Sequence, residues 1–364
     1  MPFSDFHGNA ETVHRLRDML ARERFPHAVI LSGASGSGKY TLALMLAQAM
    51  NCLVPLQADG LPDFCGRCPN CIRIAQAADL DARFAEAVEA RDNMREADKK
   101  EARIFVQTHP DVLVIPPDPP QMMVKVDQVR RVIDSIYYRP AEGRERVYIF
   151  TDSAFIKEAA NSLLKVLEEP PEFATILLLS ENPGELLPTI RSRSMTFPLR
   201  ALGVEEIESD LAKRRPEWKP PQRALVARLS EGALGRARNF DLAAYVAARA
   251  DALTILNSVR VGEHGELFKV TETYRPGAEG REKTEHLLHA LYSVLRDLMF
   301  LGSGAPQLVC NSDIPAELGK LSESVDFEWI AATSDRLAEV QRGMRRNLLR
   351  SLSLDAFAVA LEMA

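Results

Sequence analysis

The feature that most constrains this chain is a short apolar run followed at once by a glycine-rich turn. Residues 27–32 (HAVILS) predict a buried strand, residues 33–39 (GASGSGK) form the turn, and helix-forming residues follow it. This order is typical of a P-loop, in which backbone N–H groups and a lysine bind phosphate at a helix N-terminus. The candidate nucleotide-binding residues are Gly33, Gly36, Gly38, Lys39 and Thr41.

The pattern departs from a P-loop directly after the lysine. A P-loop needs Ser or Thr at that position because its hydroxyl ligates magnesium, but this chain has Tyr40. Thr41 comes one residue late, and one step along a helix turns a side chain by about 100°. The loop is therefore expected to be able to hold ATP with Mg²⁺ but not to hydrolyse it. The alternative is a glycine-rich turn that binds nothing.

Composition excludes several classes of protein. The length of 364 residues predicts two or three domains. A net charge of −6 argues against a protein that coats nucleic acid with a basic surface. The N-terminal residues lack a basic segment followed by an apolar one, and no apolar run is long enough to span a bilayer. We therefore expect a cytoplasmic protein with no membrane partner.

Four of the five cysteines fall within 20 residues. Their two tight C-x-x-C steps match a tetrahedral Zn²⁺ site, and four sulfur ligands would leave no open position for catalysis. A structural zinc is therefore predicted, and the alternative is a group of partly buried thiols without metal. The predicted ligands are Cys52, Cys65, Cys68 and Cys71.

Continuous runs of Val, Ile and Leu alternate with amphipathic helices over the first 200 residues, which predicts a parallel α/β sheet buried on both faces. Residues 77–103 are charged and read as a solvated helical insertion, and from about residue 201 the pattern is helical only. We interpret residues 261–280 as a loop between helices. The predicted strands after the first are residues 112–115, 147–150, 175–179 and 195–199.

The strand at 147–150 also bears on catalysis. In a P-loop ATPase this strand ends in a metal-side Asp followed by a Glu that polarises the attacking water. Here Thr151 stands where the Asp belongs, and Asp152 stands where the Glu belongs. We interpret Asp152 as the cap of the next helix rather than as a catalytic carboxylate.

Together these motifs resemble the clamp-loader AAA+ family over residues 26–200. The resemblance rests on Pro26-His27-Ala28, the P-loop, the four-cysteine loop and His109-Pro110-Asp111. It rests most specifically on residues 159–171 (AANSLLKVLEEPP) and on Ser192-Arg193-Ser194.

The resemblance implies a three-part fold and a set of partners. The expected fold class is α/β, an AAA+ P-loop parallel-sheet domain (1–198) that carries a four-cysteine zinc module (52–71) and the charged insertion (77–103). A small helical lid domain (199–245) and an all-α collar domain for oligomerisation (246–364) are expected to follow. Such proteins form a five-membered ring with the motor and delta subunits, which loads a sliding clamp onto primed DNA within a DNA polymerase holoenzyme.

In that ring, one subunit's Ser-Arg-Cys arginine reaches the neighbour's γ-phosphate, where it stabilises transition-state charge. The matching residue is Arg193, although Ser194 replaces the cysteine, and nearby Arg191 is the competing candidate. A local ion pair of Arg193 is the alternative. Where active relatives carry a nucleotide-sensing arginine, this chain has Gly235, with Arg236 one residue later. This difference adds to the missing magnesium hydroxyl at residue 40 and the missing carboxylate at residue 151. Together the three favour the family's hydrolysis-deficient member.

Three other interpretations stay open at this stage. One is the ATP-hydrolysing motor subunit of the same loader. A second is a zinc-dependent nucleic-acid-binding module, for which the cysteine loop offers only Arg67 and Arg73 as basic residues. A third is a small-molecule kinase, which the missing magnesium hydroxyl and the long helical region argue against.

Overall fold

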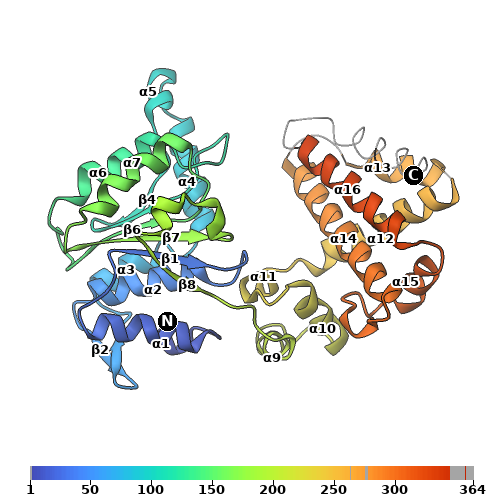
Figure 1. The fold of residues 1–364 in the computed structure, drawn as a ribbon, viewed down its shortest axis with the longest axis horizontal. Helices are drawn as coiled ribbons and strands as arrows, with labels where there is room; N and C mark the ends of the chain where they lie inside the picture. The colour runs from blue at the N-terminus through green and yellow to red at the C-terminus, as the bar shows by residue number, and fades with distance from the viewer. Residues whose placement is uncertain (1, 263, 275–277, 345–356, 358–364) are drawn as a thin grey trace. The chain divides into compact units, whose positions relative to one another are not determined.

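A computed structural model describes residues 2–262, 264–274, 278–344 and 357 (Figure 1). Its centre is a six-stranded sheet with the order β4-β5-β6-β7-β1-β8. Every pair in it is parallel except β4 with β5. The strands are β1 (Ala28–Ser32), β4 (Val106–His109), β5 (Val112–Ile115), β6 (Arg146–Phe150), β7 (Ala174–Ser180) and β8 (Met195–Pro198).

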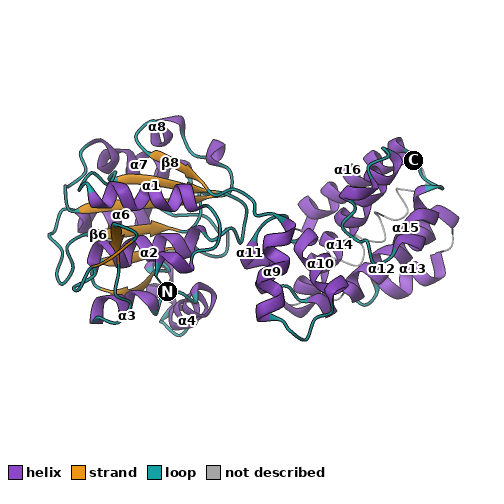
Figure 2. Cartoon of the chain, turned by 90° about the horizontal axis from the view of Figure 1, so that it is seen from below, coloured by secondary structure: helices purple, strands orange, loops and turns teal. Residues whose placement is uncertain are grey.

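Helices cover both faces of this sheet, which explains why the central strands are apolar on both sides (Figures 1 and 2). Val29 and Leu31 of β1 pack into one core, with α1 (Ala10–Ala21), α2 (Lys39–Asn51) and α3 (Pro69–Ala75). Ala28 and Ile30 point the other way, into a second core with α6 (Val126–Ile136) and α7 (Lys157–Glu168). The predicted α/β parallel-sheet class is confirmed, and the antiparallel edge strand β4 was not predicted.

The stretch between α2 and β4 carries two additions to the sheet. The first is a hairpin of β2 (Leu56–Ala58) and β3 (Leu61–Asp63) inside the cysteine loop. The second consists of α4 (Leu80–Asp92) and α5 (Glu96–Glu101), which lie in the charged stretch of residues 77–103. No residue of α4 is buried, so this helix contributes little to the core.

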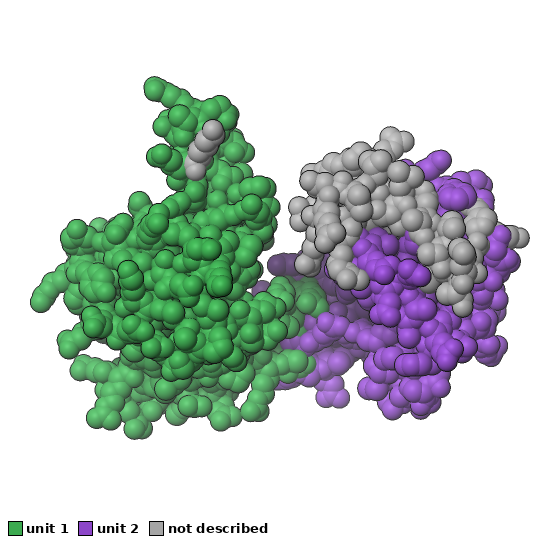
Figure 3. All heavy atoms as spheres, turned by 45° about the horizontal axis from the view of Figure 1, so that its top comes forward, with its two compact units in different colours: residues 1–202, 233–236 green, residues 203–232, 237–364 purple. Residues whose placement is uncertain are grey.

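The chain divides into two compact units (Figure 3). The first is Met1–Leu202 with Ala233–Arg236, and the second is Gly203–Gly232 with Ala237–Ala364. All regular structure described in the second unit is helical, as expected for the C-terminal half. Its larger helices are α9 (Val204–Arg214), α10 (Pro220–Leu229), α12 (Leu242–Val261), α13 (His264–Thr271), α14 (Ala278–Gly302), α15 (Pro315–Ser322) and α16 (Phe327–Met344).

The interpretation of residues 261–280 as a loop is wrong. Helix α13 occupies residues 264–271 and α14 begins at Ala278, while residues 263 and 275–277 lie outside the described part of the chain. Leu267 of α13 is fully buried in the second unit's core, so a tertiary contact stabilises a helix that the polar local sequence does not favour. The boundary between a lid (199–245) and a collar (246–364) remains a prediction.

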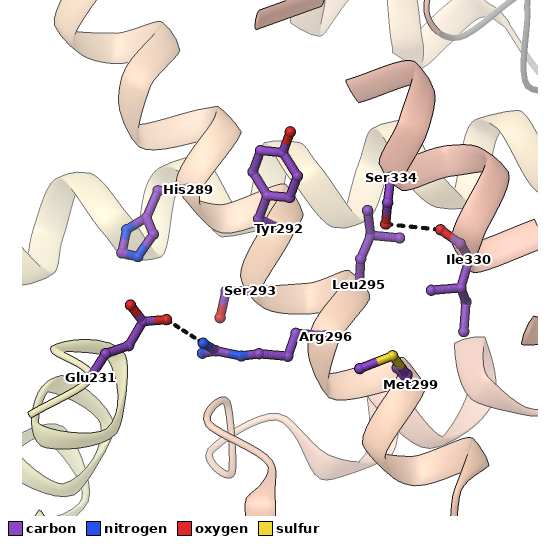
Figure 4. A pocket seen from close by; sticks show the side chains of 9 residues that line it. All are labelled: Glu231, His289, Tyr292, Ser293, Leu295, Arg296, Met299, Ile330 and Ser334. Carbon is purple, nitrogen blue, oxygen red and sulfur yellow. Dashed lines mark hydrogen bonds and ion pairs between the residues drawn. The ribbon is translucent and has the colours of Figure 1, made fainter. Parts of the chain in front are cut away.

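The second unit also contains a pocket of about 290 Å³ (Figure 4). Leu295 and Met299 of α14 and Ile330 of α16 line it. An ion pair between Arg296 and Glu231 lies at its edge. None of the predicted site residues lines this pocket. Among the described residues, no helix combines the length and the apolar character needed to cross a lipid bilayer.

Candidate functional site

The predicted P-loop lies between β1 and α2, at the carboxyl edge of the parallel strands where ligands bind in α/β sheets. Two glycines make its tight path: Gly36 has φ of 78°, and Gly38, the N-cap of α2, has φ of 92°. These are left-handed conformations that residues with a Cβ rarely adopt. The local fold is therefore that of a phosphate-binding turn.

The side chain of Lys39 forms hydrogen bonds with the backbone of the P-loop. Its Nζ donates to the carbonyl of Gly33 at 2.5 Å and to that of Ala34 at 2.9 Å. Burial lowers the pKa of Lys39, and the carboxylates of Glu181 and Asp152 oppose this shift. Glu181 follows β7, and the pairing of β7 with β1 brings it to the same edge of the sheet as the lysine.

Tyr40 forms a hydrogen bond with the segment that follows α3. Its hydroxyl donates to the carbonyl of Ala77 at 2.6 Å, just beyond α3. Burial raises the pKa of this phenol well above its ordinary value. Thr41 is exposed on α2. The tyrosine thus has a structural partner and supplies no metal ligand.

Two other segments crowd the P-loop. The N–H of Gly235 donates to the carbonyl of Gly36 at 2.8 Å. A Cβ at Gly36 would lie 2.7 Å from the backbone nitrogen of Arg236, and one at Gly38 would lie 3.0 Å from the Phe6 ring. The segment expected to carry a nucleotide-sensing arginine therefore packs directly on the loop with a glycine.

The end of β6 corrects one prediction. Asp152 does not cap the next helix, because α7 begins at Lys157 with Ile156 as its N-cap. Its carboxylate instead accepts the N–H of Ala154 at 2.8 Å and closes a local turn. Thr151, at the position of the metal-side Asp, carries no carboxylate. The predicted loss of the metal-binding pair is consistent with this geometry.

The four predicted metal ligands come together. One sulfur from each of Cys52, Cys65, Cys68 and Cys71 lies within 4.8 Å of the others. Tetrahedral zinc with Zn–S bonds of about 2.3 Å would place sulfurs about 3.8 Å apart, so the group fits such an ion. All four are free thiols, and three of them are buried.

Backbone N–H groups point at three of the four sulfurs. The N–H of Cys65 points at Cys52 Sγ and that of Cys68 at Cys65 Sγ, both at 3.3 Å. The N–H of Cys71 is 3.5 Å from Cys68 Sγ. Burial opposes ionisation of Cys68, but the N–H groups of Cys71 and Leu53 outweigh it and lower its pKa to about 6. Burial instead raises the pKa of Cys52 and that of Cys71. Such N–H···S bonds support a bound metal from its outer shell.

The cysteine module is anchored to the sheet domain by polar contacts. Gln48 of α2 donates to the carbonyl of Cys71 at 2.9 Å, and Asn70 donates to that of Asn51 at 3.1 Å. Arg73 of α3 forms an ion pair with Glu142. Glu142 belongs to the turn at residues 141–143, which precedes β6.

Asp111 of the His-Pro-Asp motif holds that turn. Its carboxylate accepts the N–H groups of Ala141, Glu142 and Gly143 at 2.7, 2.8 and 2.7 Å. Burial would raise the pKa of Asp111, but these three donors outweigh it and lower the pKa below the ordinary value of 3.8. The motif therefore has a structural role: through Asp111 it holds the start of β5 against the turn that contacts the cysteine module. We call this contact the Asp111 clamp.

Replacing Asp111 with Asn should destabilise the first unit by roughly 2–4 kcal/mol, because an amide cannot accept all three N–H groups and presents its own donors to them. Thermal unfolding followed by circular dichroism, with hydrogen exchange at the three amides, measures this. In the wild type the contribution should be present above pH 4 and lost as pH falls through the lowered folded-state pKa. The exposed Asp134→Asn is the matched control, and an equal effect in both variants would contradict the clamp.

The predicted arginine finger lies on the surface, after the short helix α8 (Pro188–Arg191). Arg193 Nη2 donates to Glu168 Oε1 at 2.8 Å, and Nη1 donates to the carbonyl of Thr189 at 3.1 Å. The local ion pair named above as the alternative to a finger is therefore present, with Glu168 as its partner, while the Arg193 side chain remains 36% exposed. Arg191 is also exposed. The sequence had indicated Glu168 only as part of the Glu-Glu-Pro-Pro string.

Comparisons with known proteins agree with these motifs. A family model described as DNA polymerase III, delta subunit, matches residues 8–203, more than half of the chain. DNA polymerase III subunit delta' of Bacillus subtilis (strain 168) is 25% identical over 303 residues, which cover 82% of this chain and 79% of that protein.

Longer relatives match part of this chain. DNA polymerase III subunit tau of Escherichia coli (strain K12) is 32% identical over 237 residues, which cover 64% of this chain and 31% of tau. The chain thus spans about a third of the tau subunits it matches. Among solved structures, a DNA polymerase III gamma subunit-related protein of Thermotoga maritima is 18% identical over 96% of this chain and 99% of that chain, with a TM-score of 0.43.

Proposed function

This chain belongs to the DNA polymerase III delta-subunit family, and from that premise we propose that it is the delta-prime subunit of a clamp loader. In this role it is a stator, a subunit that does not itself turn over ATP. It supplies Arg193 to the ATP site of a neighbouring motor subunit. The expected partners are motor and delta subunits in a five-membered ring, with the sliding clamp and primed DNA reached through the assembly.

The observation that carries the proposal is the hydrogen bond from the Tyr40 hydroxyl to the carbonyl of Ala77. Tyr40, the residue after the P-loop lysine, therefore makes a structural contact, whereas an active ATPase needs a magnesium ligand at this position. Thr151 in place of the metal-side carboxylate supports the same conclusion. So does the backbone bond between Gly235 and Gly36, where active relatives have a sensing arginine.

Arg193 is suited to act on ATP that is bound by a neighbouring subunit. A guanidinium with free N–H groups on a protein surface can reach a phosphate on a neighbour and stabilise charge that develops there. The long match to a delta' subunit, over 82% of this chain, favours this role over that of the motor subunit.

We also propose that the four-cysteine group holds a structural Zn²⁺. Four thiolates would complete its coordination, so the ion would close the loop between α2 and α3 and take no part in ATP hydrolysis. The N–H···S bonds of the module and its burial against the sheet domain support this.

The isolated chain is expected to show no Mg²⁺-ATPase activity above background, and Lys39→Ala is expected to leave that background unchanged. Steady-state phosphate release measures both, with the motor subunit of the same loader as the positive control. Adding the wild-type chain to motor and delta subunits should then raise clamp-stimulated hydrolysis. Turnover by the isolated chain that Lys39→Ala abolishes would contradict the stator role.

A further inference from the structure

The contacts of Arg193 point to a second residue in the proposed chemistry. Two elements far apart in sequence hold the guanidinium: the carboxylate of Glu168 at the end of α7, and the carbonyl of Thr189 in α8. Glu168 retains 52% of its side-chain exposure, so the pair sits at the surface. An arginine has five N–H donors in one rigid plane. Two are used here, and the others remain for a partner's oxygen.

We propose that Glu168 is a positioning residue for Arg193, an inference that rests on the proposed finger role. A long exposed arginine samples many rotamers, and freezing them at the moment of reaction opposes catalysis. Contacts from two directions fix both the position and the plane of the guanidinium before a phosphate arrives. Glu168 thus prepares the donor group and touches no substrate itself.

Local stability does not explain a carboxylate at this position. Glu168 is the last residue of α7, where the partial negative charge of the helix end disfavours an acidic side chain. An exposed ion pair adds little to folding stability. The contact with Arg193 is therefore the reason we give for an acidic residue at this position. The adjacent Glu169 is also exposed and acidic but does not form this pair, so it is a matched control.

The test measures ATP hydrolysis by the reconstituted complex with Glu168→Gln, Glu168→Asp, Glu169→Gln and Arg193→Ala. Glu168→Gln keeps an acceptor but loses the charge, and should lower kcat about three- to tenfold with KM for ATP changed less than about twofold. Glu168→Asp keeps the charge and should recover most of that loss. Glu169→Gln should match the wild type, and all four variants should melt and assemble as it does.

The outcomes separate the inference from the proposed function. If Arg193→Ala impairs kcat while Glu168→Gln is equal to or faster than the wild type, Glu168 does not position the arginine, and the inference fails alone. Failure of Glu168→Gln to assemble would also overturn it, because the carboxylate would then act in subunit contact. If Arg193→Ala has no effect, the finger role itself fails.

Discussion

Replacing Arg193 with alanine is expected to slow clamp-stimulated ATP hydrolysis by the reconstituted loader at least about tenfold at the neighbouring site, because an arginine supplied in trans stabilises charge only in the transition state. The loss should appear in kcat, with nucleotide affinity and assembly nearly unchanged. Removing the exposed pair with Glu168 should hardly alter stability. Single-turnover hydrolysis, with the remaining motor sites inactivated, isolates the site concerned.

Arg191→Ala is the matched control for this experiment. Both arginines are exposed or half-buried and lie two residues apart, so general loss of positive charge would affect both variants equally. A full rate in Arg193→Ala with a loss in Arg191→Ala would reassign the finger. A full rate in both variants would remove the proposed contribution of this surface to catalysis.

Loss of the proposed zinc ion should have the second large effect. Cys68→Ser, or treatment with a strong chelator, is expected to reduce bound zinc from one ion per chain to none. It should also destabilise the first unit by at least about 3 kcal/mol, because metal binding and folding of such modules are coupled. The effect should extend beyond the loop, since Cys52, Cys68 and Cys71 are part of the core beneath the sheet. Metal analysis and thermal unfolding measure the two losses.

Cys310→Ser provides the control, because this fifth cysteine is buried in the second unit and is not part of the four-cysteine group. It should leave the zinc content at one. Zinc binds thiolates and displaces protons, so affinity should fall as the pH is lowered. A Cys68→Ser variant that keeps its zinc and its melting temperature would contradict a structural metal at this site.

Local sequence was sufficient for the elements whose signals are short-range. Apolar runs marked β1, β5, β6, β7 and β8, and the glycines marked a turn that requires left-handed backbone. Cysteine spacing marked four sulfurs that the structure brings within 4.8 Å. Several secondary-structure elements were missed, among them the β2–β3 hairpin, the edge strand β4 and helix α13. Strand β4 is held by its pairing with β5, and α13 by the burial of Leu267 in the second unit's core, and neither has a strong periodicity of its own.

The sequence by itself determined which chemical groups this protein has: a phosphate-binding turn without its magnesium hydroxyl, four thiols at metal-binding spacing, and an arginine in a family motif. Tertiary structure alone decided what those groups contact. It directs the Tyr40 hydroxyl to Ala77, brings Glu181 near Lys39, and pairs Arg193 with Glu168 from 25 residues away. The physical reason is that residue identity and local periodicity fix backbone conformation over a few residues, whereas the partner of a polar side chain depends on which strands and helices the fold makes neighbours.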